Sequence, residues 1–350
     1  MKKKEQELFG VKEIARRAQV SIGTVDRVIH NRNGVSEKTR EKINGIIKEL
    51  NYQPNILASR LASRKVYEIA VLIPKTSEET DFWEAPLKGI QRADTEVRKY
   101  GISIQVFFFD LKDKNSFTKQ ARAVLKKRPH GILLSPLFNQ EAAGFAQSCI
   151  DNNIPVVLID TPLPNGKGLC YIGPDMFYSA YQAAQLIDIG TWKDGEILFL
   201  NISEAGLDPQ IEKGFDSYFS DNGKQQKILK LNINQTDFRS IERHLTATLL
   251  KHKEIVSIFV TNSRVSAVAS YLEKRGMEDT FLVGYDILKA NLKYLEKGII
   301  DFLISHKPEE QGYRAIIAIY QTLVLGSGTE EKTLMPIDII TRYNYKFYSS

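Results

Sequence analysis

Charged and polar side chains stand at the ends of several apolar runs in the later part of this 350-residue chain. Carboxylates accept hydrogen bonds from hydroxyl groups and arginine donates them, so this mixture suits a polyol. An aromatic pair further upstream offers an apolar face for a sugar ring. The candidate ligand-binding residues are Phe82, Trp83, Asp160, Asn262, Arg264, Asp286 and His306.

Several of these residues also fit other roles. Trp83 is equally compatible with a core or interface aromatic residue, and His306 with a satisfied histidine of the core or surface. Asp160 and Asp286 could in principle form an acid–base pair, but carboxylates serve binding clefts in the same way.

Nine strand-like apolar runs alternate with amphipathic helical stretches from Tyr67 onward. Short apolar strands separated by helices predict parallel sheets covered on both faces, and the carboxyl ends of such strands open into a crevice. Nine strands exceed one modest sheet, and a break at TPLPNGKG, after Asp160, predicts two α/β lobes. The runs are residues 68–74, 102–109, 131–136, 155–160, 196–201, 228–233, 256–262, 281–286 and 301–306.

The N-terminal region has a different, all-helical pattern. VKEIARRAQVSIGTVDRV predicts two short helices around a tight turn at residues 19–21. We expect a third helix to begin after Ser36 as its N-cap, and the apolar face of that helix would complete a three-helix core.

Side chains left outside on the second helix can enter the major groove of DNA. Arg27 can pair with a guanine edge, a contact that contributes ~1–3 kcal/mol of discrimination. The hydroxyl groups suit phosphate oxygens, which fix the register of a protein on DNA, although each also suits a helix cap. The candidate DNA-contacting residues of this region are Ser21, Ile22, Gly23, Thr24, Arg27, Ser36 and Thr39.

Excess positive charge is confined to the N-terminal region. Residues 1–65 hold 15 Lys and Arg against 7 Asp and Glu, whereas the other 285 residues hold 33 against 35. A basic region of this kind neutralises phosphates. We expect a cytoplasmic protein without membrane contact, because there is no secretory signal and no run of the ~18–20 apolar residues that span a membrane. Cys149 and Cys170 are expected to be free thiols.

The N-terminal motifs resemble the lactose/galactose repressor family of bacterial regulators. The resemblance covers residues 10–64 and rests on V-x-x-I-A-x-x-A-x-V-S-x-x-T-V-x-R-V, then VSEKTREKI, ELNYQPN and A-x-x-L-A. It implies a transcription regulator, expected to repress, whose homodimer binds a pseudo-palindromic operator in double-stranded DNA. It also implies that Asn55 starts a hinge helix, that Ala58 lies against the minor groove, and that Leu61 wedges between base pairs. A packed core leucine is the alternative for Leu61.

The later part resembles, more loosely, the type-I periplasmic sugar-binding fold. This resemblance implies two Rossmann-like lobes, three crossovers near residues 161–162, 298–302 and 326–330, and a small carbohydrate-like effector in the interlobe cleft. The expected domains are a helix-turn-helix domain at 1–53, a hinge helix at 54–65 and an effector-binding domain at 66–350. Within the last of these, lobe 1 takes about 66–161 and 303–327, and lobe 2 about 162–302 and 328–350.

The chain departs from these patterns at several places, including Thr161, where some sugar-binding relatives have arginine, and Ser263, where aspartate is frequent. Asp26 replaces a common serine and would face DNA unfavourably unless it pairs with Arg27, Arg32 or a neighbouring helix. Ile22 and Gly23 offer no polar contact to a base, so we expect operator specificity to depend on Arg27, Leu61 and DNA deformability. Ile211 stands where sugar-binding relatives carry arginine, which predicts a pocket unlike the ribose, lactose and purine sites.

Two other classes of protein use the same two-lobed body. A sugar-uptake binding protein is disfavoured by the basic N-terminal region and the missing export signal. An enzyme is disfavoured because the chain lacks GxxxxGK, a GxGxxG after a strand, GxSxG and HExxH. We therefore expect neither enzymatic activity nor a cofactor or metal.

Overall fold

The computed structural model describes residues 10–29, 32–50, 52, 66–77, 81–164, 166, 170–204, 206–328 and 330–348. The chain divides into two compact units between residues 64 and 65. We call the first unit the head and the second the body, and each is described by itself. Within the described ranges, no helix is long and apolar enough to cross a bilayer.

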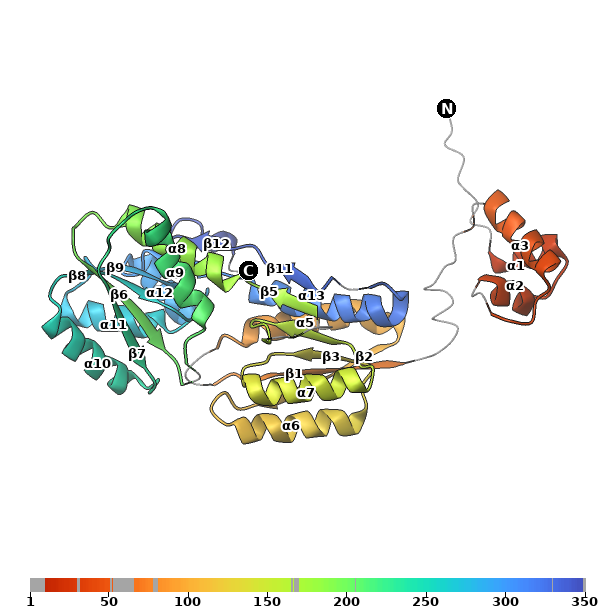
Figure 1. The fold of residues 1–350 in the computed structure, drawn as a ribbon, viewed down its shortest axis with the longest axis horizontal. Coiled ribbons are helices and arrows are strands. Elements are labelled where there is room, and N and C mark those ends of the chain that lie inside the picture. Colours follow the sequence, from red (N-terminus) through yellow and green to blue (C-terminus); the bar gives the residue numbers. More distant parts are fainter. Residues whose placement is uncertain are drawn as a thin grey trace, which may run out of the picture. The chain divides into compact units, whose positions relative to one another are not determined.

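The described part of the head contains three helices, α1 (Val11–Ala18), α2 (Ile22–Ile29) and α3 (Glu37–Glu49) (Figure 1). Their inner faces form one small core because apolar residues recur at helical spacing. Its fully or nearly fully buried members are Ile14, Ala15, Ala18, Val25, Val28 and Ile43. The predicted three-helix arrangement is therefore present.

Local contacts fix where the head helices begin and end. Gln19 takes a left-handed conformation (φ 57°) directly after α1, which allows the tight turn into α2. Ser36 is the predicted N-cap of α3, and its hydroxyl accepts a hydrogen bond from the backbone N–H of Thr39 at 3.4 Å. An Arg17–Glu49 ion pair of 3.0 Å ties α1 to α3.

The described residues of the body form two six-stranded sheets, which confirms the predicted pair of α/β lobes. The first sheet has the order β11-β5-β4-β3-β1-β2 and the second has β12-β10-β9-β8-β6-β7. All pairings are parallel except that of β10 with β12. The strands are β1 (Tyr67–Pro74), β2 (Ile102–Phe109), β3 (Gly131–Leu134), β4 (Val156–Ile159), β5 (Cys170–Gly173), β6 (Glu196–Ile202), β7 (Ile228–Ile233), β8 (Ile255–Val260), β9 (Phe281–Tyr285), β10 (Phe302–Ser305), β11 (Lys332–Leu334) and β12 (Asp338–Ile340).

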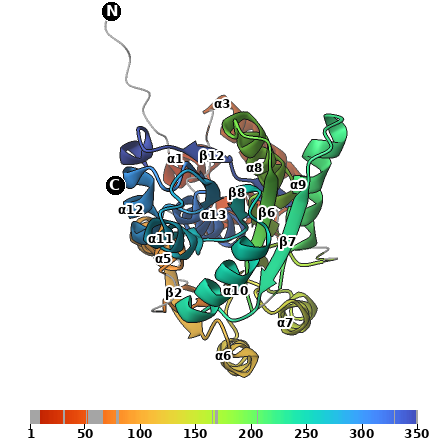
Figure 2. The ribbon, with the colours of Figure 1, turned by 90° about the vertical axis from the view of Figure 1, so that its left-hand side faces the viewer.

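Helices cover both faces of each sheet, which explains why the central strands are continuous apolar runs. In the first lobe, α5 and α13 pack on one face and α6 and α7 on the other. In the second lobe, α8 and α9 pack on one face and α10 to α12 on the other (Figure 2). The helices are α5 (Glu84–Val97), α6 (Lys114–Lys127), α7 (Asn139–Asp151), α8 (Met176–Gly190), α9 (Pro209–Asp221), α10 (Phe238–Lys251), α11 (Val265–Arg275), α12 (Lys289–Lys297) and α13 (Pro308–Tyr320), with short turns η1 (Arg98–Tyr100), η2 (Gln321–Leu325) and η3 (Tyr345–Phe347).

Two glycines bring α5 and α13 into direct backbone contact. A Cβ atom on Gly89 would lie 1.8 Å from the carbonyl oxygen of Glu309, and one on Gly312 would lie 2.2 Å from that of Pro86. No larger residue fits at either position without separating the helices. This contact holds α13 firmly in the first lobe.

The three crossovers between the lobes lie later in the chain than the sequence predicted. They follow β5, β10 and β11, at residues 174–175, 306–307 and 335–337. The assignment of 162–173 and β11 to lobe 2 was therefore wrong, as was that of β10 to lobe 1. The boundaries near β5 and β11 were misplaced because these strands have only four and three residues, too few for a recognisable strand pattern. β10 was recognised as a strand, but the sequence pattern does not show that it pairs with β9 in the second sheet.

Candidate functional site

The outer surface of α2 carries the side chains that the sequence assigned to the major groove. Ile22 is 49% exposed, and Gly23 and Arg27 are also exposed. A Cβ atom on Gly23 would have only Ser21 Oγ nearby, at 3.7 Å, so this surface has room for side chains of other sizes. These features leave the face of α2 accessible to a partner.

The hydroxyl groups of the head have capping roles within the protein. Ser21 Oγ accepts a hydrogen bond from the backbone N–H of Thr24 at 3.1 Å, and the two hydroxyl groups lie 2.9 Å apart. Ser36 and Thr39 repeat this arrangement at the start of α3, with hydroxyl oxygens 2.8 Å apart. All four hydroxyl groups remain near the surface, so capping leaves them able to contact phosphate.

Asp26 forms an ion pair with Arg32, whose Nη1 lies 3.2 Å from the carboxylate. Arg32 is also fixed through its carbonyl oxygen, which accepts a hydrogen bond from Arg40 at 3.1 Å. One of the predicted partners of Asp26 is thus present. The remaining candidates Asn55, Ala58 and Leu61 lie outside the described residues.

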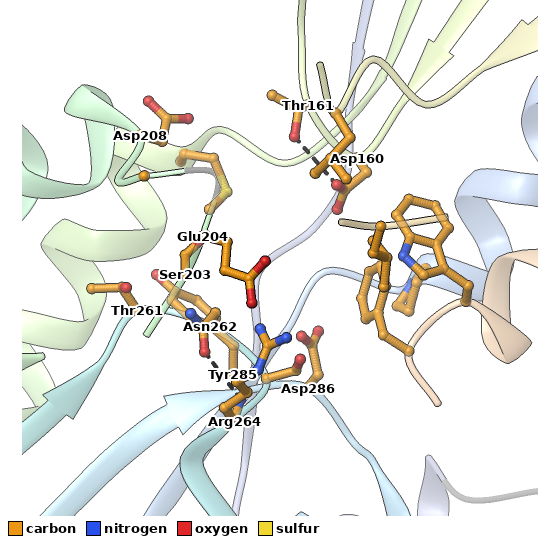
Figure 3. A pocket seen from close by; sticks show the side chains of 18 of the residues that line it. Asp160, Thr161, Ser203, Glu204, Asp208, Thr261, Asn262, Arg264, Tyr285 and Asp286 are labelled. Carbon is orange, nitrogen blue, oxygen red and sulfur yellow. Dashed lines mark hydrogen bonds between the residues drawn. The ribbon is translucent and has the colours of Figure 1, made fainter. Parts of the chain in front are cut away.

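All seven candidate effector-binding residues line one cavity of about 1350 Å³ in the body. The cavity lies at the carboxyl ends of strands from both sheets, since its walls include residues that directly follow β1, β2, β4, β6, β8, β9 and β10. Open parallel sheets place ligand sites at this edge. Figure 3 shows the polar side chains converging on the space.

Asp160 and Asp286 occupy equivalent places, directly after β4 and β9, and both have left-handed backbones with φ of 70° and 74°. Aspartate tolerates this conformation better than most residues. The turn ends each strand and directs the side chain into the cavity (Figure 3). Asp160 also accepts a hydrogen bond from the hydroxyl of Thr161 at 3.2 Å.

Burial makes the ionised form of both carboxyl groups unfavourable. The pKa of Asp286 is raised from 3.8 to about 8, by desolvation first and by the charge of Asp160 second. Desolvation also raises the pKa of Asp160, to about 6, although the Thr161 hydroxyl opposes this change. Asp286 is 8% exposed, and its carboxylate has no hydrogen-bond or ion-pair partner among the described residues.

His306 is buried beside the cavity in a small polar network. Its Nε2 lies 2.6 Å from Ser179 Oγ, and its ring packs against Tyr285 with centroids 5.1 Å apart. Desolvation lowers the pKa of His306 to about 4. The histidine is therefore neutral, and its ring nitrogen has a hydrogen-bond partner within the protein, as expected for a satisfied core histidine. It also lines the cavity.

Asn262 and Arg264 shape the loop after β8. The Asn262 amide donates to the carbonyl of Ile202 at 2.8 Å and accepts from the backbone N–H of Arg264 at 3.1 Å. Asn262 thus fixes the loop as well as lining the cavity. The Arg264 guanidinium extends into the cavity, on the side where the carboxylates of Glu204 and Asp286 lie (Figure 3).

Phe82 and Trp83 form the aromatic part of the wall, with rings perpendicular and centroids 5.1 Å apart. Trp83 is only 4% exposed and belongs to the core of the first lobe, whereas Phe82 is partly exposed. Both interpretations of Trp83 therefore hold together, since it fills the core and reaches the cavity.

Sequence reasoning missed several residues of the cavity. Lys112, after β2, lies 3.3 Å from the carboxylate of Glu204, after β6, so this ion pair links the two lobes. Asp208 caps α9 by accepting from the backbone N–H of Gln210 at 2.8 Å. Its place before Pro209 is a helix-start signal that could have located it.

Asn201 and Gln311 were also missed, and both are buried. Asn201 is 3% exposed; its oxygen accepts from the Thr261 hydroxyl at 2.9 Å, and its Nδ2 has no partner among the described residues. Gln311 joins the lobes at the second crossover: its oxygen accepts from the backbone N–H of Asp160, and its Nε2 donates to the carbonyl of His306, both at 2.9 Å.

Comparison with known proteins covers both units. Residues 10–55 match the family described as bacterial regulatory proteins, lacI family. Residues 69–327 match the periplasmic binding protein domain. The HTH-type transcriptional regulator RegA of Clostridium acetobutylicum is 30% identical over 151 residues, which are 43% of this chain and 43% of RegA. The match thus spans less than half the length of that relative.

Solved structures resemble the body. One from Bacteroides fragilis, described as a LacI transcriptional regulator, is 29% identical with a TM-score of 0.76, and the match covers 81% of this chain and all of that chain. GanP, a glucose-galactose binding protein from Geobacillus stearothermophilus, is 21% identical with a TM-score of 0.71, over 80% of this chain and 99% of GanP. At that identity GanP supports the fold alone.

Proposed function

We propose that this chain, which belongs to the lacI family of bacterial regulatory proteins, is a ligand-responsive transcription regulator. It binds a specific DNA sequence and acts as a repressor. The observation that carries the proposal is the combination, in one chain, of an exposed α2 surface in a basic head and a body with a large interlobe cavity. An uptake protein has no use for the first feature, and an isolated DNA-binding module has none for the second.

The proposed DNA partner is a pseudo-palindromic operator that a cytoplasmic homodimer reads with two heads. Arg27 is the proposed base-reading residue of the major groove, where Ile22 touches a thymine methyl group. Residues 54–65 are the proposed hinge segment, with Asn55 at its start, Ala58 against the minor groove and Leu61 as the wedge.

The proposed effector is a small carbohydrate-like polyol. The cavity supports this assignment because it combines an aromatic pair, Phe82 and Trp83, with carboxylate and arginine side chains. Binding would change the angle between the lobes, and the resulting coupling to DNA affinity is typically ~1–3 kcal/mol.

The DNA part of the proposal is tested with Leu61→Ala. Affinity for an operator selected from random DNA should fall, while binding to non-specific DNA and its salt dependence stay nearly unchanged, because the wedge acts only on the kinked site. Fluorescence anisotropy at several salt concentrations measures both. An equal loss on the two DNAs would contradict the wedge assignment.

The effector part is tested by thermal denaturation of the full chain with a panel of sugars, sugar derivatives and purines. A ligand present at a hundredfold excess over its dissociation constant stabilises the folded state by ~2.7 kcal/mol. A stabilising sugar that also changes operator affinity supports the regulator. Conversion of that sugar to a product would instead indicate an enzyme, and binding without any effect on operator affinity would indicate a transport role.

A further inference from the structure

We propose that the ligand of the cavity is a polyol that carries a protonated amine, such as an amino sugar or an amino cyclitol, and that neutral, N-acetylated and phosphorylated sugars are disfavoured. This inference rests on the proposed function, since it concerns the same cavity. It begins from the balance of charge on the cavity wall.

Acidic side chains outnumber basic ones among the described residues that line the cavity. Two of the three basic side chains are already paired with acids near the rim: Lys75 lies 2.9 Å from Asp110, and Lys112 lies 3.3 Å from Glu204. The third, Arg264, donates a hydrogen bond to the carbonyl oxygen of Ile202 at 3.4 Å, and the wall holds further carboxylates beyond the acids of these two pairs. Those carboxylates are Asp81, Glu84, Asp160, Asp208 and Asp286.

Asp286 is the most informative of these acids. More than nine-tenths of it is buried, it points into the cavity, and its carboxylate has no hydrogen-bond or ion-pair partner in the described part of the chain (Figure 3). A buried carboxylate of this kind is costly unless it is paired or protonated. An ammonium group on the ligand would supply the partner and donate up to three hydrogen bonds.

The neighbours of Asp286 reinforce this preference. Asp160 contributes to raising its pKa, and the carboxylate of Asp208 in turn helps to raise the pKa of Asp160. Carboxylates that disfavour each other's ionisation share a region of negative potential. The groups that face this region are Asp160, Asp208, Asp286, Glu204, Arg264 and the neutral Tyr285 and His306.

The rest of the wall suits the other parts of such a ligand. Asn201 is 3% exposed and its Nδ2 has no acceptor among the described residues, so it can donate to a ring or hydroxyl oxygen. The partly exposed ring of Phe82 can lie against the ligand, and aromatic faces attract cations as well as sugar rings. A phosphate group would instead meet several carboxylates, and two of the basic side chains near it, Lys75 and Lys112, are already paired with acids.

The first experiment needs no ligand. If Asp286 lacks a cationic partner, Asp286→Asn should raise the melting temperature of the full chain at pH 8.5, since the variant removes an uncompensated buried charge. Asp221→Asn, an exposed acid at the end of α9 outside the cavity, is the control of equal charge change. A lower melting temperature for Asp286→Asn alone would mean that Arg264 already neutralises Asp286, and would overturn the proposal.

The second experiment compares matched sugars by calorimetry at pH 7. The probes are glucosamine, galactosamine and mannosamine, each with its parent hexose, its N-acetyl derivative and its 6-phosphate. We expect at least one amine to bind tenfold or more tightly than its three counterparts. In Asp286→Asn this preference should fall to near unity, whereas Asp221→Asn should retain it.

Two results would overturn the inference. One is tighter binding of a neutral or phosphorylated sugar than of its amine; the other is no amine binding even at 50 mM. If a neutral sugar binds and also changes operator affinity, the regulator stands and only the amine is wrong. If the amine binds but operator affinity never responds, the cavity assignment stands and the regulatory function is wrong.

Discussion

The two lobes contribute different chemistry to one cavity. The first lobe supplies the aromatic pair and Asp160. Trp83, the larger ring of the pair, is almost completely buried in the core of that lobe. The second lobe supplies most of the polar wall, from loops after β6, β8 and β9. We therefore expect the first lobe to hold the shape of the proposed ligand and the second to bind its hydroxyl groups and charge.

Truncation of Trp83 should give the largest effect on stability. Trp83→Ala removes a side chain that is 4% exposed, and such losses typically cost about 3–5 kcal/mol. Trp83→Phe keeps an apolar ring and should cost much less. The free energy of unfolding in urea measures both variants. If Trp83→Ala proved nearly neutral, the aromatic pair would belong to the cavity alone and the proposed division of roles would fail.

Gln311→Ala should produce the next largest loss, because it breaks the link between the lobes. The substitution leaves the backbone N–H of Asp160 and the carbonyl of His306 without their partner, and each unsatisfied buried group costs about 1–3 kcal/mol. Gln321→Ala, on the exposed side of η2, is a matched control. Urea denaturation checks the loss, and equal stability of both variants would show that the crossover is held by other contacts.

The sequence predicted the parts of this site that follow from the sheets. Asp160, Asn262 and Asp286 were found because each is the last residue of a predicted strand run, and parallel strands end at a common edge. Glu204 and Gln311 were missed for a different reason. The first lies in a loop and the second on a helix, where only the three-dimensional path of the chain brings the side chain to the cavity.

The fold was predictable to a similar degree. Longer strands were predicted with their observed bounds even at the edges of the sheets, as for β2 and β7, whose residues are only partly buried. Short edge strands carry little signal: β11 and β12 have three residues each and β11 is mostly exposed, so the lobe boundaries that depend on them were misplaced. The positions of the crossovers depend on which sheet each short edge strand joins. The apolar central strands do not indicate this.

The change in stability between pH 6.5 and 8 should report the ionisation of Asp286, in the second lobe. The pKa of Asp286 is raised to about 8, so the folded protein keeps a proton that the unfolded chain has lost, and stability should fall as pH rises through this window. His306, with its pKa lowered to about 4, affects the pH dependence of stability only below pH 6.5. The pKa values of Asp160 and Asp301 are raised to about 6, so the contribution of these two carboxyl groups changes mainly below this window.

The size of this pH effect is bounded by the width of the window. One pKa unit corresponds to 1.36 kcal/mol, so the decrease attributable to Asp286 is at most about 2 kcal/mol. Asp286→Asn should flatten the profile, whereas Asp160→Asn should leave it sloping. Urea titrations at pH 6.5, 7.25 and 8 give the slopes. A profile that stays equally steep in Asp286→Asn would assign the proton to another group.

Loss of the Lys112–Glu204 ion pair should have the smallest effect, because both side chains are more than 40% exposed. Exposed pairs contribute about 0–1 kcal/mol and weaken with salt. Lys112→Ala should therefore change stability little at 0.5 M salt. At low salt it should favour separation of the lobes, which small-angle scattering detects as a larger radius of gyration of the ligand-free body. Lys114→Ala, whose 3.8 Å contact with Glu141 lies within the first lobe, is the control and should leave the radius unchanged. An unchanged radius in both variants would mean that the backbone crossovers and Gln311, rather than charges across the rim, set the angle at which the two lobes meet.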